Sequence, residues 1–261
     1  MSDVFVNLLN KFGYQPVFLP HTGYVPPELY TFANHKLIRY GTLNAYMAKP
    51  FVFEPAVGNL TDIEGKITSS KNVGASVSFL TQALSMLGIG SLPKLDLSFT
   101  GSKEFVFAFT GVTYKAIDPA VLDPILQRMQ IPEAVPEEYV KNGDLHIAYE
   151  YAYATGIKMS RADGKKFSTD ISGSVGTYVD LGVNVKVEVS NNVTISFTAT
   201  DKNTVAAFAY KAGRLELRGK TWVFEPEIVR KIAAAKTKRE PFMLAKGLVL
   251  KAEEVPVAVA A

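Results

Sequence analysis

Cysteine is absent from the 261 residues of the sequence. Disulfide bonds, thiolate catalysis and cysteine palmitoylation are therefore excluded, and a reducing compartment is permitted. Histidine is scarce as well. His21, His35 and His146 lack metal-ligand spacing, and we interpret each as a surface or loop residue. The sequence thus indicates no metal site.

Catalytic and nucleotide-binding motifs are also missing. There is no P-loop and no Gly-x-Ser-x-Gly elbow, and the run GIGSLPK has Pro93 where a dinucleotide fingerprint needs its third glycine. Asp118 and Asp123 flank prolines, where helix caps and turns explain them better than catalysis does. We therefore expect no enzymatic activity and no cofactor.

Charge and long apolar runs are limited too. The net charge of +3 is too small to indicate nucleic acid, but it suits anionic headgroups, where each nearby Lys or Arg contributes about 1 kcal/mol. No apolar run approaches the roughly 18 residues of a membrane-crossing helix. The N-terminus lacks the basic start and apolar core of a secretory signal, so we expect a cytoplasmic protein.

Long alternating stretches are what the sequence has in abundance. Across residues 171–189 the odd positions are mostly apolar and the even ones mostly polar, and alternation resumes over 193–199 after Ser-Asn-Asn. This period of two predicts a two-faced β-hairpin whose first arm is far longer than a usual strand of about five or six residues. A two-residue loop would put the apolar rows on opposite faces, whereas a three-residue loop at 190–192 keeps them together. The latter pairs Val189 with Val193, Val187 with Ile195 and Val185 with Phe197.

Similar patterns occur elsewhere in the chain. Residues 63–79 and 145–157 also alternate, and 95–109 includes a run, FVFAF, that is apolar on both faces. Two strand-rich blocks, 63–114 and 145–210, are thus separated by a helical segment. Two interpretations stay open at this point: an ordinary packed sheet, or ribbons that are packed in one state and face lipid in another.

The last part of the chain has a different character. Pro226 is expected in the first turn of a basic amphipathic helix, which leads into an accessible segment suited to proteolysis. The apolar tail that follows is too short for a core of its own. We expect the tail to pack on the body of the protein, because otherwise its apolar side chains would be exposed.

The order of these parts resembles that of bacterial gasdermins. A short amphipathic N-terminal helix precedes GYQPVFLP. A glycine-rich turn, a strand pair and a short helix follow in LGIGSLPKLDLSFTGSKEFVFAFTGVTYKAIDPAVLDPIL, and GDLHIAYEYAYATGIKMS and TVAAFAYKAGRLEL come later. The resemblance covers most of residues 1–225 and lies in segment order, because the family has no sharp catalytic motif.

The resemblance implies an α+β fold like a gasdermin N-terminal domain, with a twisted, mostly antiparallel central sheet and surrounding helices. It implies a pore-forming effector of lytic, pyroptosis-like cell death that binds anionic phospholipid membranes, oligomerises and inserts β-hairpins as a large β-barrel. The protein would be a monomer or small oligomer in the cytoplasm when inactive, and a large ring in the inner or plasma membrane when active. The alternative is a soluble lipid-binding or scaffolding α+β domain that does not insert.

Two departures from the family matter. Bacterial members typically carry an acylated cysteine near the N-terminus, where this chain has Ser2, which fits small fungal gasdermin-like proteins better. The chain is also too short for the repressor domain of mammalian members. We therefore expect residues 1–225 to be the pore-forming domain and 226–261 to be a basic helix and an autoinhibitory tail. An activating protease or a second gasdermin-like chain would relieve the inhibition.

The candidate site residues form four sets. Acidic-lipid binding is assigned to Lys11, Lys36, Arg39 and Lys49. The membrane-inserting ribbons contain Ile63, Ile67, Val73, Val77, Phe79, Ile147, Tyr149, Tyr151, Val183, Val185, Val187, Val189, Val193, Ile195 and Phe197. The candidate cleavage region contains Lys236, Lys238 and Arg239. The tail would pack through Phe242, Leu244, Leu248 and Leu250.

The ribbons combine as two hairpins. Residues 63–79 with 95–109 would supply one. The other would come from 145–157 with 171–189, or from 183–189 with 193–199.

Overall fold

The computed structural model describes residues 4–33, 36–47, 49–63, 65–69, 105–126, 129, 145–161, 176–178, 185–190, 194–199, 204–218, 221–226 and 249–254. The chain forms two units. The first contains residues 1–23, 59–113 and 152–209, and the second contains residues 24–58, 114–151 and 210–261.

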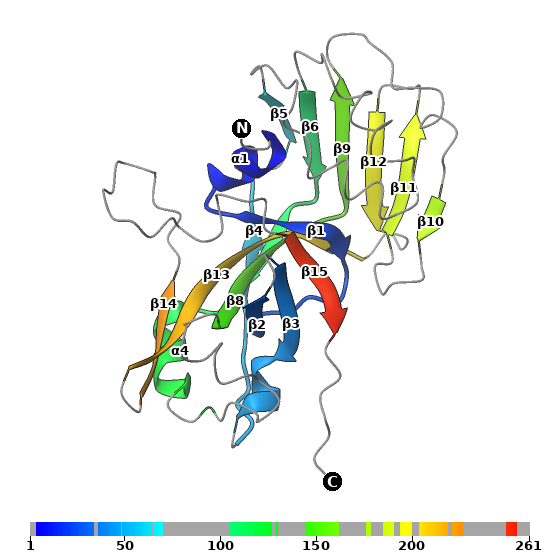
Figure 1. Cartoon of the computed structure of the whole chain (residues 1–261). Helices are drawn as coiled ribbons and strands as arrows, with labels where there is room; N and C mark the ends of the chain where they lie inside the picture. The colour runs from blue at the N-terminus through cyan, green and yellow to red at the C-terminus, as the bar shows by residue number, and fades with distance from the viewer. Residues whose placement is uncertain are drawn as a thin grey trace. The chain divides into compact units, whose positions relative to one another are not determined.

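A six-stranded antiparallel sheet lies in the first unit (Figure 1). Its strands in spatial order are β10 (Gly176–Tyr178), β11 (Val185–Ser190), β12 (Thr194–Ala199), β9 (Gly156–Arg161), β6 (Phe105–Thr110) and β5 (Gly65–Ser69). Helix α1 (Val4–Asn10) and strand β1 (Gln15–His21) belong to the same unit. The spacing of apolar residues predicts this helix, and Phe5, Leu8 and Leu9 are buried along it.

The second unit combines strands with two short helical elements. Neighbouring strands follow the order β15 (Val249–Glu254), β3 (Lys36–Thr42), β2 (Glu28–Ala33), β8 (Leu145–Ala154), β7 (Thr113–Ala116) and β4 (Ala56–Asn59). Strand β13 (Ala206–Arg218) pairs with β8 and, antiparallel, with β14 (Thr221–Pro226). The helical elements are η1 (Leu43–Tyr46) and α4 (Pro119–Leu126). Sheets that are mostly antiparallel, with few helices, confirm the predicted α+β class.

One hydrophobic core joins the elements of the second unit. It contains Leu29, Leu43, Tyr46, Ile117, Leu122, Leu126, Met129, Leu145, Ile147, Leu215 and Phe224, with Trp222 packed against it. Asp118, just before α4, caps the helix as predicted, whereas Asp123 within α4 binds a distant strand rather than forming a cap or turn. The backbone N–H of Ala120 donates to Asp118 Oδ1 over 2.9 Å and caps the helix. The N–H of Phe224 donates to Asp123 Oδ1 over 3.0 Å and ties β14 to α4.

The long alternating arm is not one strand, contrary to the prediction. Strand β10 folds back antiparallel on β11, so that Gly176 pairs with Val187 and Tyr178 with Val185. The residues between the two strands, 179–184, include Asp, Gly and Asn, which favour turns. A period-two pattern cannot reveal such a reversal, because both arms of the fold-back keep the same period.

The hairpin of β11 and β12 is confirmed, but the predicted register was wrong by two residues. Val189 pairs with Ile195 and Ser190 with Thr194, so the three-residue loop is 191–193. A shift by two keeps every side chain on its face, so alternation alone cannot exclude it. The loop in this register contains both asparagines of the Ser-Asn-Asn turn.

Residues 145–157 also differ from a single two-faced strand. They divide into β8 and β9 at Thr155, whose backbone N–H and Oγ1 both donate to the carbonyl of Thr110 over 2.9 Å. Strand β8 is buried on both faces over most of its length. His146 is consequently only 3% exposed, so the interpretation of this histidine as a surface or loop residue was wrong.

Candidate functional site

The six-stranded sheet has one apolar face built from rows that cross several strands. Paired residues of β6, β9 and β12 supply two such rows. One row contains Phe109, Ile157 and Phe197, and the other contains Phe107, Met159 and Ile195. All six side chains are at most 7% exposed. The registers of β11 place Val187 and Val189 opposite the ends of the two rows.

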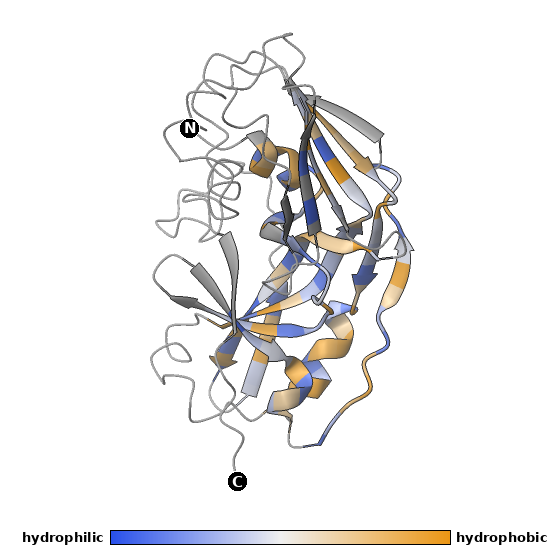
Figure 2. Cartoon of the chain, turned by 90° about the vertical axis from the view of Figure 1, so that its right-hand side faces the viewer, coloured by the Kyte–Doolittle hydropathy of each residue, from blue (hydrophilic) through white to orange (hydrophobic). Residues whose placement is uncertain are grey.

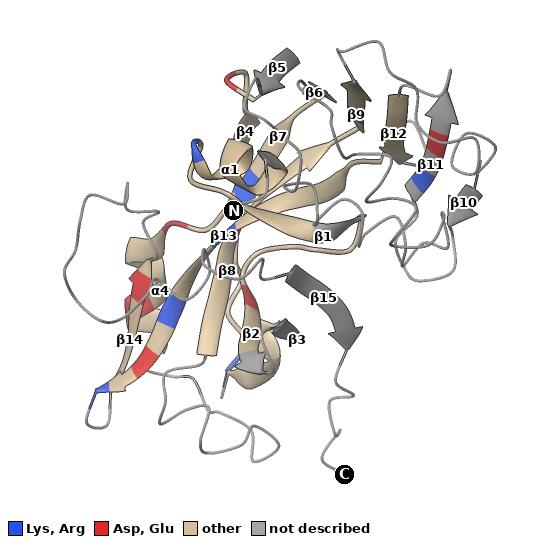
Figure 3. Cartoon of the chain, turned by 45° about the horizontal axis from the view of Figure 1, so that its top comes forward, with Lys and Arg blue, Asp and Glu red and all other residues tan. Residues whose placement is uncertain are grey.

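On β9, β11 and β12 the opposite face of this sheet is polar, and Figure 2 shows hydrophilic and hydrophobic residues alternating along strands of the sheet. Lys158 is exposed, and the Ser and Thr residues that alternate with the apolar rows of β9 and β12 are half-buried. Ser160 and Thr194 share a hydroxyl hydrogen bond of 3.0 Å between paired strands. On β11 (Figure 3), Lys186 and Glu188 form an exposed ion pair of 3.3 Å. Strands β9 and β12 therefore separate apolar from polar side chains by face, whereas β6 places Val106 and Ala108 on the polar face, opposite Ser160 and Lys158.

Aromatic side chains of the same unit cover the apolar face near β6. The ring of Phe5 in α1 lies 5.4 Å from that of Phe107 and 6.5 Å from that of Phe109, measured between centroids. Residues 206–209 at the start of β13 belong to the first unit, and the ring of Phe208 there lies 5.1 Å from that of Phe109. This face is thus held away from water by α1 and β13, and it would have to be uncovered before it could contact anything else.

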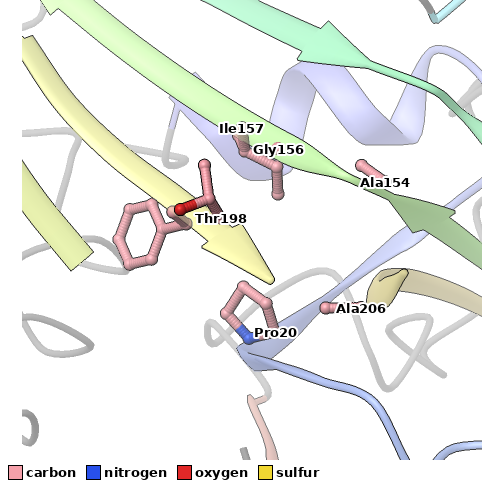
Figure 4. A pocket seen from close by; sticks show the side chains of 7 residues that line it. Pro20, Ala154, Gly156, Ile157, Thr198 and Ala206 are labelled. Carbon is pink, nitrogen blue, oxygen red and sulfur yellow. The ribbon is translucent and has the colours of Figure 1, made fainter. Parts of the chain in front are cut away.

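A hollow at the ends of β9 and β12 is too small for a ligand (Figure 4). It is lined by Pro20, Ala154, Gly156, Ile157, Phe197, Thr198 and Ala206. Its volume of about 10 Å³ corresponds to roughly one water molecule. It marks imperfect packing where β9 follows β8.

The structure brings together some predicted ribbon residues and separates others. The six-stranded sheet contains Ile67, Val185, Val187, Val189, Ile195 and Phe197. Ile63 is buried in the turn before β5, and the pairing of β5 with β6 agrees with the first predicted hairpin. By contrast, β8 holds Ile147, Tyr149 and Tyr151 in the second unit. Val73, Val77, Phe79, Val183 and Val193 lie outside the described residues.

A buried carboxylate organises β2, β3 and β8 in the second unit. Glu28 is fully buried, and Arg39 Nη2 lies 2.5 Å from its Oε1. Its Oε2 accepts hydrogen bonds from the hydroxyls of Tyr30 and Tyr151 over 2.9 and 2.7 Å. The guanidinium carbon of Arg39 lies 5.4 Å from the ring centroid of Tyr24. We call these five residues the Glu28 cluster.

Electrostatics within the Glu28 cluster follow from burial and charge. Burial, reinforced by the charge of Glu28, raises the pKa of Tyr30 well above its ordinary value. For Arg39, burial acts against the charged form, but the hydrogen bond and charge of Glu28 outweigh it and raise the pKa. The guanidinium therefore stays charged and stays bound to the carboxylate.

This cluster changes how the predicted lipid-binding residues are interpreted. Lys11 and Lys49 are exposed, whereas the side chain of Arg39 is only 13% exposed and paired with Glu28. Lys36 opens β3, where its backbone pairs with Val249. Lys11 belongs to the first unit and the other three to the second. A lipid role for Arg39 would require the ion pair to break, and the role of the whole set stays a prediction.

One part of the predicted tail is described. Leu250 lies in β15, which runs parallel to β3 and places Leu250 opposite Leu37 and Glu254 opposite Arg39. Pro226 is the last residue of β14, and the rest of the predicted basic helix lies outside the described residues. So do the cleavage residues Lys236, Lys238 and Arg239 and the tail residues Phe242, Leu244 and Leu248.

Sequence reasoning missed two groups of residues. It assigned Arg39 and Tyr151 of the Glu28 cluster to lipid contact, because no local pattern connects them with Glu28 across the sheet. It also overlooked the exposed apolar loop around Val52, although the prolines at positions 50 and 55 mark a loop around the apolar run FVF.

Within the described part of the chain, no helix combines the length and apolarity needed to cross a membrane. The same described residues contain no cluster of three or more His, Asp or Glu side chains able to hold a metal ion.

Comparisons with known proteins agree on one family. The model of the Bacterial Gasdermin Family matches residues 17–222. A gasdermin from Piscinibacter sakaiensis is 37% identical over 258 residues, covering 97% of this chain and 96% of the relative. One from a Desulfuromonadales bacterium is 27% identical over 222 residues, covering 82% of each.

The solved structure of a bacterial gasdermin from Bradyrhizobium tropiciagri matches with a TM-score of 0.49 and 12% identity, over 84% of this chain and 88% of that one. The family model covers well over half of the chain, and the identity to the first relative extends over nearly its whole length. The family predicted from segment order is thereby confirmed. The chain belongs to the bacterial gasdermin family.

Proposed function

We propose that this gasdermin is a non-enzymatic pore former that binds anionic membranes, oligomerises and inserts strands of its six-stranded sheet as a β-barrel. Membership of the family supports a pore-forming role in general. One observation carries the finer proposal: the registers of β6, β9 and β12 place the apolar rows on one face, and β9 and β12 carry Ser, Thr and Lys on the other. A barrel wall needs this division, with lipid on one side and water on the other.

The structure also favours a particular choice of inserting strands. Strand β5 pairs with β6, and both β9 and β11 pair with β12. Residues of these five strands are therefore better candidates for the barrel than residues of β8. Ile147, Tyr149 and Tyr151 are poorer candidates, because Ile147 belongs to the core of the second unit and Tyr151 to the Glu28 cluster. We therefore assign the inserting part of the second predicted hairpin to residues after Thr155.

Membrane binding would precede insertion. Lys11 and Lys49 are exposed cations that can approach anionic headgroups, and we expect vesicle binding to weaken with salt because charges are screened within about 10 Å at 0.1 M. On this proposal the protein is cytoplasmic when inactive and moves to the inner or plasma membrane to form a large ring that causes lytic cell death.

The tail would restrain this activity. Strand β15 pairs with β3, so the described part of the tail contacts the body of the second unit. Cutting near Arg239 would turn the pairing into an association between separate chains, which dilution disfavours. A protease or a second gasdermin-like chain would then act as the activator.

Liposome leakage tests the proposal. The full chain, and the chain ending at Arg239, should be mixed with dye-filled vesicles of phosphatidylglycerol or of phosphatidylcholine, with negative-stain imaging of the same samples. We expect dye release and rings on phosphatidylglycerol vesicles. Binding of both forms to these vesicles without leakage or rings would favour the alternative, a lipid-binding or scaffolding domain.

A further inference from the structure

We propose that residues 49–53, which follow η1, form a membrane anchor that docks the full-length chain at the bilayer interface. Phe51 and Val52 would enter the boundary between headgroups and acyl chains before any strand inserts. This inference rests on the proposed function in one respect, namely that a membrane is the target. It names the surface that makes the first contact.

The tip of this loop is unusually apolar for an exposed segment. Val52 is 77% exposed and Phe51 37%, and Lys49 and Pro50 beside them are exposed as well. Val57 in the following strand β4 is 67% exposed. A single exposed apolar residue needs no explanation, so exposure alone does not assign a role.

The way the loop is held provides the second observation. The side-chain amide of Asn44 in η1 donates from Nδ2 to the carbonyl of Phe51 over 2.8 Å, and its Oδ1 accepts from the N–H of the same residue over 3.1 Å. Phe53 packs against the core of the second unit and lies 5.1 Å from the ring of Phe51. The loop is thus fixed on both sides of Val52, and its apolar tip is displayed without a large ordering cost on docking.

The size of the tip decides between possible occupants. The surface that two side chains can bury is far smaller than the roughly 800 Å² that each partner buries in a stable protein interface. A lipid interface has no such threshold, because each apolar side chain that enters contributes separately. A bilayer therefore fits this surface better than a second copy of the chain.

Charge plays the smaller part at this tip. Lys49 precedes the apolar residues and Glu54 follows them, and both are exposed. Their opposite charges leave little net attraction to anionic lipid. Docking should therefore depend more on Val52 than on Lys49.

The first experiment measures partitioning of the full chain onto vesicles of equal parts phosphatidylglycerol and phosphatidylcholine. V52D should lower the partition coefficient about tenfold or more, since it removes an apolar side chain and adds a carboxylate. V121D is the matched control, because Val121 is 45% exposed on α4 in the same unit and undergoes the same change. Equal partitioning of the two variants would overturn the proposal, as would failure of the unsubstituted full chain to bind these vesicles.

The second experiment uses the absence of cysteine, which allows a single fluorophore to be attached at V52C or at V121C. Lipid-borne quenchers should reduce fluorescence at position 52 severalfold more than at position 121. Equal quenching at the two positions would overturn the proposal. Protection of position 52 by protein, without quenching by lipid, would overturn it as well and would assign the tip to contacts between copies. Dye release measured on the same vesicles reports separately on pore formation, so either idea can fail alone.

Discussion

Replacing Arg39 with alanine separates two roles that this side chain could have. As a lipid ligand, Arg39 would contribute to membrane binding and little to folding. In the Glu28 cluster, Arg39 neutralises a fully buried carboxylate, with 13% of its own side chain exposed. R39A would leave Glu28 with two tyrosine hydroxyls and the N–H of Val25, 3.5 Å from its Oε1, but without the guanidinium. Removing one partner of a buried pair costs about 3–5 kcal/mol in unfolding free energy.

The assay is urea unfolding of the full chain, followed by the fluorescence of Trp222. This is the sole tryptophan of the sequence, and it packs against the core of the second unit, to which the Glu28 cluster also belongs. With a slope of about 3 kcal/mol per molar urea, the expected loss lowers the midpoint by about 1–1.7 M. K49A, at an exposed cation of the same unit, should change the unfolding free energy by less than about 0.5 kcal/mol.

The double variant with Glu28→Gln and Arg39→Met completes the test. It removes both charges, so its unfolding free energy should exceed that of R39A even though two residues are changed. A loss below about 1 kcal/mol in R39A, combined with a loss of vesicle binding, would refute the structural role and restore the lipid assignment.

Three further predictions concern the sheet that is proposed to insert, the tail and pH. V187D should abolish dye release while the protein stays folded. S196D, which adds the same charge on the polar face, should retain dye release. Leakage by a folded V187D protein would contradict the assignment of β11. Truncation after Arg239 should increase leakage and toxicity to the expressing cell, and an inert truncated chain that becomes active only with a second protein would show that the tail does not restrain it. The unfolding free energy should fall as pH rises above about 10, since the raised pKa of Tyr30 keeps it protonated when folded, while the unfolded chain releases the proton. Y30F should reduce this dependence of the unfolding free energy on pH. It should also lower the unfolding free energy by about 1.5–3 kcal/mol, because one hydrogen bond to a carboxylate is lost. An unchanged pH dependence in Y30F would exclude Tyr30 as its source.

Alternation predicted the sheet but not all of its connections. It identified the hairpin of β11 and β12 and its face, because inward and outward positions follow directly from a period of two. Alternation could not distinguish registers of β11 and β12 that differ by two residues, and it could not detect the reversal at β10. Neither a shift by two residues nor the reversal changes the face on which a side chain of β11 lies. The break at Thr155 depends on hydrogen bonds to Thr110, which is distant in sequence.

The candidate site shows a similar division. The strand positions of the predicted ribbon residues in β11 and β12 could be found from a local pattern. The Glu28 cluster could not, because Glu28 and Tyr151 meet only when β2 pairs with β8. A cation such as Arg39 looks like a surface residue in the sequence, and only tertiary contacts reveal the acid that binds it.

The reversal between β10 and β11 has a consequence for reach. An extended chain rises about 3.4 Å per residue, so residues 176–190 could span about 50 Å, whereas the six residues of β11 span about 20 Å. The described pairing that holds the shorter form consists of three residue pairs, Gly176 with Val187, Thr177 with Lys186 and Tyr178 with Val185. Releasing those three pairs would more than double the distance that this segment covers and leave the register of β11 with β12 unchanged. The folded-back form is therefore shorter than the chain that it contains. The extended form is long enough to cross a hydrocarbon layer about 30 Å thick, and the folded-back form is not.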